Sequence, residues 1–399
     1  MNILFLMKVF EVGGQEVVTN TLAQQFENNG HHVTIASFKE PSVLMAKRVD
    51  LRIPLFTIGY FEYSSKNVTR IYNIIKERNI DIVINQWGLP YIPSKLLKKV
   101  RKICIERNEK SFKIISVYHN SPDINARIKS VEIELEQTNN ILRKCILYLK
   151  KDIFRCITSF SMRYAYDVSD VYQVLSPSFV DKFRVFTGIK NTDKLMVQTN
   201  PITIDASNFL FRSSLKKKEI IYVGRIDYNQ KRVYRVIDTW ALLEEQYKDW
   251  NLTIVGDGIS KDNILTQVKK LGLRRVSLEG FKDPKKYYER ASILLLTSEY
   301  EGFPLVLAEC MSFGVVPVVY GSYSAVYDII KDNVNGLILP FNEKGYNSQA
   351  MSERLAEIMS SQQKYISMAK EAIKTSQEYS VDIIYQSWNK LFNELINKL

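Results

Sequence analysis

Two carboxylates stand on either side of an apolar run in the segment SEYEGFPLVLAECMSFG. Glu301 precedes this run and Glu309 follows it, with seven residues between the two. Pro304 favours the first turn of a helix, so the free amides near Phe303 and Leu305 would lie at the positive end of that helix. Glu309 would lie one turn further in, leaning back towards the same end. There it can accept hydrogen bonds from two neighbouring hydroxyl groups, as on a ribose, while Glu301 can bind a sugar hydroxyl.

A simpler role is open to both glutamates, which could only complement the charge of a helix start. Glu309, however, lies between Ala308 and Cys310 in an apolar stretch. A buried carboxylate without a partner is costly, so Glu309 is expected to have a specific one.

A basic pair occupies one loop, in the segment VGRIDYNQKRV. A strand is predicted to end at Gly224, Arg225 follows at once, and Lys231 comes six positions later, before the next helix. A guanidinium can bind a phosphate with two parallel hydrogen bonds, and an ammonium adds a mobile point charge. Because anions bind where parallel strands end, the pair indicates a diphosphate site. A solvated charged loop is the alternative.

Buried apolar runs that alternate with helical patterns would position these residues. Alternation of this kind predicts parallel sheets wound by crossover connections. Strands are predicted at 3–7, 33–36, 82–85, 114–118 and 172–175, and then at 219–224, 252–255, 276–278, 293–297, 315–319 and 337–339. Helical segments are predicted at 351–379 and 383–399. We therefore expect an α/β protein with two Rossmann-like, doubly wound parallel-sheet domains that face a cleft, at 1–200 and 201–382, with the helix at about 383–399 packing back on the first.

Taken together, the motifs resemble glycosyltransferase family 4. The resemblance rests on Glu301 with Glu309, Gly224 and Arg225 with Lys231, the turn Gly256-Asp257-Gly258, and Gly13 with Gly14 in the first loop. It covers nearly the whole chain and is strongest from about 219 to 340. It implies a retaining, nucleotide-sugar-dependent enzyme with the GT-B fold, which has two Rossmann-like domains around a cleft.

The resemblance also implies roles for single residues. Arg225 and Lys231 would neutralise the diphosphate of the donor, Glu309 would hold the ribose, and Glu301 with the amides after it would hold the donor sugar. The other implied donor-binding positions are Gly14, Gly224, Gly256, Gly280, Phe281, Gly302, Phe303, Pro304 and Leu305. No metal and no cofactor are expected, since the two cations would take the place of a metal, and the frequency of donors in the family favours uridine.

Residues of the first domain have weaker signals. A lone histidine such as His119 is usually a satisfied polar residue, but the resemblance implies that it contacts the donor sugar across the cleft. Trp87 and Asn120 follow predicted strands and could contact the acceptor, or anchor a loop and form a turn. The glycine pair before Gln15 brings Gly14 near the diphosphate by resemblance, although such a pair more often makes only a turn.

Several other activities compete with sugar transfer as the function of this chain. The resemblance suggests front-side transfer in which the departing diphosphate oxygen takes the acceptor proton, with Arg225 and Lys231 stabilising its charge. A glycosidase would need both carboxylates beside one bond, which a loop and a helix position make less favourable. A dehydrogenase is disfavoured because the first loop lacks the GxGxxG spacing. An epimerase or phosphorylase of the same fold, and a catalytically silent partner protein, remain alternatives.

The charge of the chain is uneven. The net charge is +12, and the segment 95–163 alone holds 16 basic and 7 acidic side chains. Within this segment Leu142, Ile146, Leu149, Ile153, Ile157 and Phe160 share one helical face, with Arg143, Lys144, Lys150, Lys151 and Arg155 towards the other side. The apolar face could pack on its own domain, or the basic segment could meet an anionic membrane. Nucleic acid is disfavoured because no binding motif accompanies the charge.

Localisation and partners follow from the same features. The first residues lack the basic start and cleavage site of a signal peptide, and no apolar stretch is long enough to span a membrane. The four cysteines show no metal-type spacing, so reduced thiols are expected. We therefore expect a cytoplasmic enzyme, peripheral on the inner membrane face, that binds a nucleotide sugar and a glycan or lipid-linked acceptor in the synthesis of bacterial-type surface polysaccharide.

Overall fold

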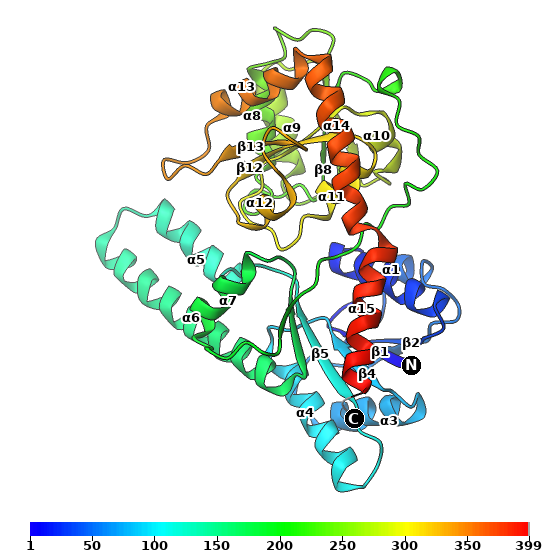
Figure 1. Cartoon of the computed structure of the whole chain (residues 1–399). Coiled ribbons are helices and arrows are strands. Elements are labelled where there is room, and N and C mark those ends of the chain that lie inside the picture. The colour runs from blue at the N-terminus through cyan, green and yellow to red at the C-terminus, as the bar shows by residue number, and fades with distance from the viewer. Residues whose placement is uncertain (398–399) are drawn as a thin grey trace. The chain divides into compact units, whose positions relative to one another are not determined.

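The computed structural model describes residues 1–397 and divides them into two compact α/β units (Figure 1). The first unit comprises Met1–Pro201 together with the last helix, α15 (Val381–Ile396), and the second comprises Ile202–Ser380. The chain therefore passes from one unit to the other twice, and the second unit is one uninterrupted segment.

The first unit is built on a seven-stranded sheet in which every strand pair is parallel. Its strands lie in the order β3-β2-β1-β4-β5-β6-β7, so the direction of winding reverses between β1 and β4. Helices cover both faces of such a sheet, which is why its central strands read as continuous apolar runs. The strands are β1 (Asn2–Met7), β2 (His32–Ser37), β3 (Leu55–Thr57), β4 (Ile82–Asn85), β5 (Lys113–Tyr118), β6 (Val171–Val174) and β7 (Leu195–Val197).

Side-chain caps begin several helices of the first unit. Ser64, Asn125 and Asn140 each accept a hydrogen bond from an amide in the first turn of the helix that follows. The last helix, α15, packs on α1, where the rings of Phe26 and Phe392 are 5.2 Å apart. The helices are α1 (Gly14–Asn28), α2 (Val43–Ala46), α3 (Ser65–Glu77), α4 (Tyr91–Glu106), α5 (Ala126–Gln137), α6 (Ile141–Val168) and α7 (Phe179–Thr187).

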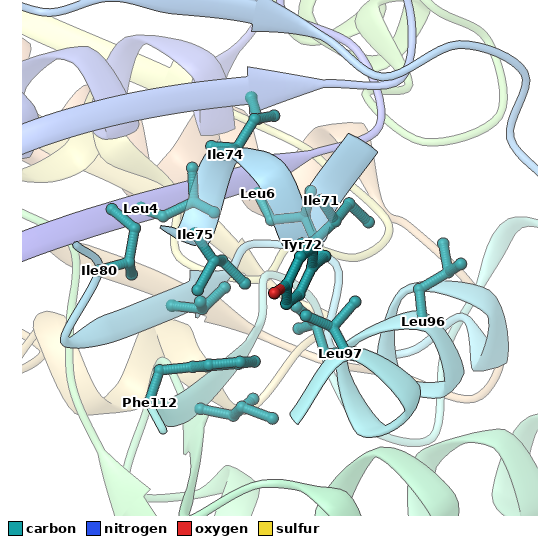
Figure 2. Packing of buried hydrophobic residues seen from close by; sticks show 14 of the residues in the cluster. Leu4, Leu6, Ile71, Tyr72, Ile74, Ile75, Ile80, Leu96, Leu97 and Phe112 are labelled. Carbon is teal, nitrogen blue, oxygen red and sulfur yellow. The ribbon is translucent and has the colours of Figure 1, made fainter. Parts of the chain in front are cut away.

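A hydrophobic cluster fixes β1 from one side. Leu4 and Leu6 of β1 pack with Ile71 and Ile75 of α3 and with Leu97 of α4 (Figure 2), and all five are almost completely buried. Burial of each such side chain stabilises the fold by about 1.5–3 kcal/mol. The loop after β1 therefore starts from a firmly held position.

The second unit repeats the plan with six parallel strands. Their order is β10-β9-β8-β11-β12-β13, with the reversal between β8 and β11. The strands are β8 (Glu219–Val223), β9 (Asn251–Val255), β10 (Val276–Gly280), β11 (Ile293–Leu296), β12 (Val316–Gly321) and β13 (Leu337–Pro340). The helices are η1 (Ser213–Leu215), α8 (Val233–Ala241), α9 (Lys261–Lys270), α10 (Lys285–Arg290), α11 (Leu305–Ser312), α12 (Ala325–Ile329), α13 (Ser348–Met359), α14 (Gln362–Ser376) and η2 (Gln377–Tyr379).

The predicted α/β class with two wound parallel sheets is confirmed, and two details differ. The short strands β3 and β7 were not predicted; each has three residues and partly exposed side chains. The helical segment predicted at 351–379 is broken, because Ser361 caps a new helix by accepting a hydrogen bond from Lys364 N. The end of the segment predicted at 383–399 lies outside the described residues.

Candidate functional site

Three glycines bring the loops after β8 and β9 into contact. Gly224 and Gly256 have φ angles of 149° and 155°, which other residues rarely adopt. A Cβ atom on Gly256 would lie 1.8 Å from Gly224 O, and one on Gly258 would lie 2.2 Å from Ile226 O. Ile226 N also donates to Asp257 O at 2.9 Å. The two loops therefore pack main chain against main chain, which only glycine permits at these positions.

The cationic loop after β8 is shaped by hydrogen bonds of its own residues. The Tyr222 hydroxyl donates to Arg225 O at 2.8 Å, and Asp227 Oδ1 accepts from Gln230 N at 2.6 Å. Arg225 donates from Nη2 to Gln230 Oε1 at 2.9 Å, yet its side chain is 59% exposed. The guanidinium is thus restrained and still open to an anion from solvent.

Lys231 and Glu301 form an ion pair across the reversal point of the second sheet. Lys231 Nζ lies 2.5 Å from Glu301 Oε1, and the side chains are only 17% and 8% exposed. Glu299 N donates to Gln230 O at 2.7 Å and ties the same two loops together. Lys231 and Glu301 are predicted to bind different groups of the donor, and in the structure each is also the partner of the other. Removing one would leave a buried charge uncompensated.

Glu309 is buried on α11, which starts at Leu305, so that Pro304 is the N-cap and lies one residue before the first turn in which the sequence placed it. Its carboxylate accepts a hydrogen bond from the Thr203 hydroxyl at 2.5 Å, and the Tyr288 hydroxyl lies 3.5 Å away. Removal from water raises its pKa, against the effect of the Thr203 hydrogen bond. The expected specific partner of Glu309 is therefore Thr203, and the two glutamates have separate surroundings.

The remaining donor positions differ in what they offer a ligand. Gly280 has φ 73° and accepts from Gly256 N at 2.8 Å, so it joins the same layer of loops. The Phe281 ring is 61% exposed and available for stacking. Phe303 is 7% exposed and packs on Tyr379 at 5.3 Å, which leaves only its main chain for a ligand. Gly302 and Pro304 belong to the segment that leads into α11, and Leu305 is the first residue of that helix.

His119 lies at the carboxyl end of β5 in the first unit. Its Nε2 atom is 2.5 Å from Gln86 Oε1, and Gln15 Nε2 donates to Gln86 O at 2.7 Å. Removal from water lowers the pKa of His119 to about 4, so the ring is neutral at pH 7. Asn120 Oδ1 accepts from Ser121 N at 3.0 Å, the bond of a local turn. The structure therefore joins His119 with Gln15 and Gln86, which sequence analysis did not select.

An acid occupies the start of α1. The Glu16 carboxylate is 9% exposed, and a Cβ on Gly13 would lie 2.4 Å from Glu16 Oε2. Burial raises the pKa of Glu16 and so favours its uncharged form. Any anion that approaches the amide of Gly14 would meet this carboxyl group, which sequence analysis did not consider.

A lysine lies between aromatic rings beside the reversal point of the first sheet. Lys8 follows β1, and its Nζ is 4.9 Å from the ring centroid of Trp87 and 5.1 Å from that of Phe61. Asn85 Oδ1 accepts from Trp87 N at 3.1 Å. Trp87 Nε1 is buried and has no hydrogen-bond partner within residues 1–397. Lys8 was not selected from the sequence, although its place directly after a buried strand is the signal that could have found it.

The described residues offer neither a metal site nor a membrane span. Among them no group of three or more His, Cys, Asp or Glu side chains is arranged to hold a metal ion. Over the same residues, no helix combines the length and apolar character needed to cross a bilayer. Cys104 and Cys310 are buried, whereas Cys145 and Cys156 are exposed, and all four are free thiols.

Two family models match the chain in succession. The model described as Glycosyltransferase Family 4 matches residues 12–205, and the model described as Glycosyl transferases group 1 matches residues 205–375. The chain belongs to glycosyltransferase family 4. The point at which the two matches meet lies four residues beyond Pro201, where the first unit of this glycosyltransferase gives way to the second.

Curated relatives extend over most of this glycosyltransferase. The amylovoran biosynthesis glycosyltransferase AmsD of Erwinia amylovora is 23% identical over 391 residues, 96% of each chain. A Campylobacter jejuni α-1,4-N-acetyl-D-galactosaminyltransferase, named for an undecaprenol-diphosphate-linked saccharide, is 28% identical over 63% of this chain and 66% of its own.

Solved structures share the fold of this glycosyltransferase. Anabaena HepE, solved in complex with UDP and glucose, superposes with a TM-score of 0.73 at 17% identity and covers 99% of this chain and 100% of its own. The likeness confirms the predicted GT-B type of fold, with two Rossmann-like parallel-sheet domains.

Proposed function

We propose that this glycosyltransferase moves a hexose-type sugar from a UDP-sugar to a hydroxyl group of a glycan or lipid-linked saccharide, with retention of configuration, in the synthesis of bacterial cell-surface polysaccharide. The names of the relatives support the pathway class, since AmsD is named for amylovoran biosynthesis and the C. jejuni enzyme for a lipid-diphosphate-linked saccharide. The UDP complex of HepE supports the base. The observation that carries the proposal is the group of Arg225, Lys231 and Glu301 at the reversal point of the second sheet.

The diphosphate would bind to the two cations of the loop after β8. Arg225 is exposed and can take phosphate oxygens with two parallel hydrogen bonds. Lys231 is paired with Glu301 and would share its protons with the diphosphate when the donor binds. As the bond to the sugar breaks, charge develops on the departing oxygen, and these two groups stabilise it.

The ribose would bind to the buried end of α11. The Thr203 hydroxyl uses one oxygen of Glu309. A carboxylate has further lone pairs, so ribose hydroxyls can donate to the same group. The raised pKa of Glu309 reflects burial, and two donated hydrogen bonds would lower it again and hold the charged form.

The donor sugar would be held by Glu301 and by the amides that precede α11. His119 Nε2 faces the acceptor Gln86 Oε1, so Nε2 carries the proton of the neutral ring and Nδ1 can accept a hydrogen bond from a sugar hydroxyl. The neutral ring cannot supply a cation at pH 7. In the proposed front-side reaction, the acceptor oxygen forms the new bond to the anomeric carbon and the bond to the diphosphate breaks. The departing oxygen takes the acceptor proton, so no protein base is required.

We further propose that the reaction needs neither a resident metal nor a cofactor, because two cationic side chains already supply the charge that faces the diphosphate. The first experiment measures thermal unfolding with UDP, ADP, GDP and their sugars, with and without EDTA. Selective stabilisation by a UDP-sugar that survives EDTA is the expected result. Stabilisation that EDTA abolishes would contradict the metal-free site, and stabilisation by another base would contradict UDP.

Transfer itself needs a separate assay, because a silent partner protein could still bind a nucleotide. Release of UDP in the presence of a bacterial membrane extract that supplies acceptors is the expected result. Conversion of the donor to an epimer without UDP release would favour the epimerase alternative. Tight donor binding without either reaction would favour the silent partner.

A further inference from the structure

Helix α6 exposes an apolar face that no other described element covers. The face, called here the α6 stripe, consists of Leu142, Ile146, Leu149, Ile153, Ile157 and Phe160. The exposed fraction of these residues ranges from 49% for Ile153 to 77% for Leu142. Their spacing of three and four residues places them on one side of the helix over five turns.

The opposite side of α6 is the one that packs inward. Leu147, Thr158 and Met162 are buried there. Asn125, the cap of α5, donates from Nδ2 to Thr158 Oγ1 at 2.8 Å and holds the helical hairpin of α5 and α6, drawn in green in Figure 1. The sequence left open whether the stripe packs on its own domain, and the structure excludes that interpretation. The stripe is a second apolar face in addition to the packed one.

Cationic side chains border the stripe. Arg143 is exposed along one edge, and Lys150 stands on the same edge, where its Nζ lies 3.6 Å from Glu134 and 5.8 Å from the Phe154 ring centroid. By contrast, Lys151 is turned towards α5, where it pairs with Glu132 at 2.8 Å. The basic residues predicted to lie together on one side are therefore divided, and two of them remain beside the exposed stripe.

An aromatic and basic surface continues the stripe at its C-terminal end. The Phe160 ring is 6.4 Å from the Tyr91 ring at the start of α4. Lys95 Nζ lies 5.3 Å from the Tyr91 ring and 4.2 Å from the Tyr63 ring, and Lys98 Nζ lies 5.5 Å from the Tyr164 ring. Lysine stems and tyrosine rings of this kind suit the boundary between lipid tails and headgroups.

We propose that the α6 stripe inserts its apolar side chains into the surface of an anionic phospholipid membrane, with Arg143, Lys150, Lys95 and Lys98 at the level of the headgroups. Helices bound in this way combine an exposed apolar face with bordering cations, and both are present here. The proposal concerns the surface of the first unit alone and does not depend on the sugar that is transferred.

Charge decides between a membrane and a second copy of the chain. A symmetric dimer through the α6 stripe would bring the same cations of two copies together, in a segment, 95–163, that holds 16 basic and 7 acidic residues. Like charges at an interface oppose association. An anionic leaflet neutralises these cations while it covers the apolar side chains.

The native thiols allow a direct measurement of insertion. Cys145 and Cys156 are exposed beside the stripe, whereas Cys104 and Cys310 are buried. A C145S chain labelled at Cys156 with a polarity-sensitive NBD fluorophore is mixed with vesicles of phosphatidylcholine containing phosphatidylglycerol. We expect a blue shift and a rise in emission, together with quenching by lipids that carry a quencher within the bilayer. Emission unchanged at all lipid concentrations would overturn the proposal.

Matched variants separate the apolar and the charged contributions. In co-sedimentation of unlabelled chains with the same vesicles, L149S with I153S is expected to lower the partition constant at least tenfold. The control L51S with L271S replaces two exposed leucines elsewhere, 103% and 45% exposed, and should bind like the wild type. R143Q with K150Q is expected to lower the partition constant roughly fivefold per cation. The control K269Q with K270Q removes two cations from α9 and should leave the partition constant nearly unchanged.

Three outcomes would count against the membrane. If L149S with I153S and the control L51S with L271S lowered the partition constant equally, binding would not depend on the α6 stripe. If the chain bound equally well to vesicles of phosphatidylcholine alone, anionic lipid would not be required for binding. A doubled mass in light scattering that L149S with I153S abolishes, without vesicle binding, would assign the face to a second copy. All replaced side chains are solvent-exposed or partly so, and unchanged unfolding temperatures would show that the variants are folded.

Discussion

The two units carry different side chains at the equivalent point of their sheets, where the direction of winding reverses. In each sheet the winding reverses beside the first strand of the unit, between β1 and β4 in one and between β8 and β11 in the other. The second unit presents Arg225 and Lys231 there, whereas the first presents Lys8 between aromatic rings and the buried Glu16. Parallel sheets offer a crevice at such a point, and the side chains decide what it binds.

The difference extends to how charge is balanced. In the second unit the buried Lys231 has the carboxylate of Glu301 as its partner. In the first unit burial favours the uncharged forms of Glu16 and His119 instead. A site with paired charges can exchange partners with a diphosphate, while uncharged groups such as His119 and Glu16 suit hydrogen bonds with hydroxyl groups. We therefore expect variants of the two units to affect different steps.

The largest effect is expected from K231A in the second unit. It removes a cation from the departing diphosphate and leaves Glu301 uncompensated, so kcat at saturating donor should fall by about 100- to 1000-fold. Donor affinity should change much less. The control K218A removes a lysine from the far end of β8, where it pairs with Asp249, and should retain activity. If K231A kept the turnover of the wild type, the assignment of Lys231 to the departing diphosphate would be wrong.

A second effect separates binding from turnover within the same unit. E309A removes the acceptor of the ribose hydrogen bonds, and the Kd for UDP in calorimetry should rise by about 10- to 100-fold. E309Q keeps the shape of the side chain and most of its packing, so it should fall between E309A and the wild type. Unchanged affinity in both variants would show that the ribose binds elsewhere.

The stability of the protein at acidic pH tests whether the His119 ring is uncharged in the folded state. The pKa of His119 is about 4 in the folded protein and 6.5 ordinarily. Between these values the unfolded chain binds more protons, so the stabilising contribution is complete above pH 6.5 and is lost as the pH falls towards 4. The wild type should therefore lose roughly 2 kcal/mol more between pH 7 and pH 5 than H119Q in urea unfolding. H32Q replaces an exposed histidine and should behave like the wild type. Parallel losses in H119Q and the wild type would contradict the neutral ring.

The smallest effect is expected from K8M. This variant keeps an apolar stem between Phe61 and Trp87 but removes the charge. If the first unit binds the acceptor, the KM for the acceptor should rise about three- to tenfold, while the Kd for UDP stays the same. A change in donor affinity instead would mean that both reversal points serve the donor, and the contrast between the units would fail.

Periodicity predicted the fold best where strands are buried on both faces. The runs at β1, β4 and β11 were recognised because nearly all of their residues are apolar, and all of them except Asn2 are buried. The edge strands β3 and β7 have three residues each and leave no such run. Short edge strands depend on a neighbouring strand that the local sequence does not reveal.

Long-range partners in the site could not be predicted in the same way. Single residues such as Glu309 were selected by their unusual surroundings in the sequence. The partner of Glu309 is Thr203, 106 positions away, and Lys231 and Glu301 are 70 positions apart. Likewise, spacing showed which residues of α6 share a face but not whether another element covers that face. Tertiary packing alone answers that question.

The last helix has a consequence for how the chain can be divided. Because α15 belongs to the first unit, the second unit is an insertion within the first. Its two ends lie together, since Ile202 N donates to Tyr379 O at 2.8 Å. Residues 202–380 can therefore be excised as one fragment, and joining 201 to 381 through a short linker would leave the first unit with its aromatic cover of Phe26 intact. Each half of the enzyme could then be produced and studied alone, from two genes rather than one.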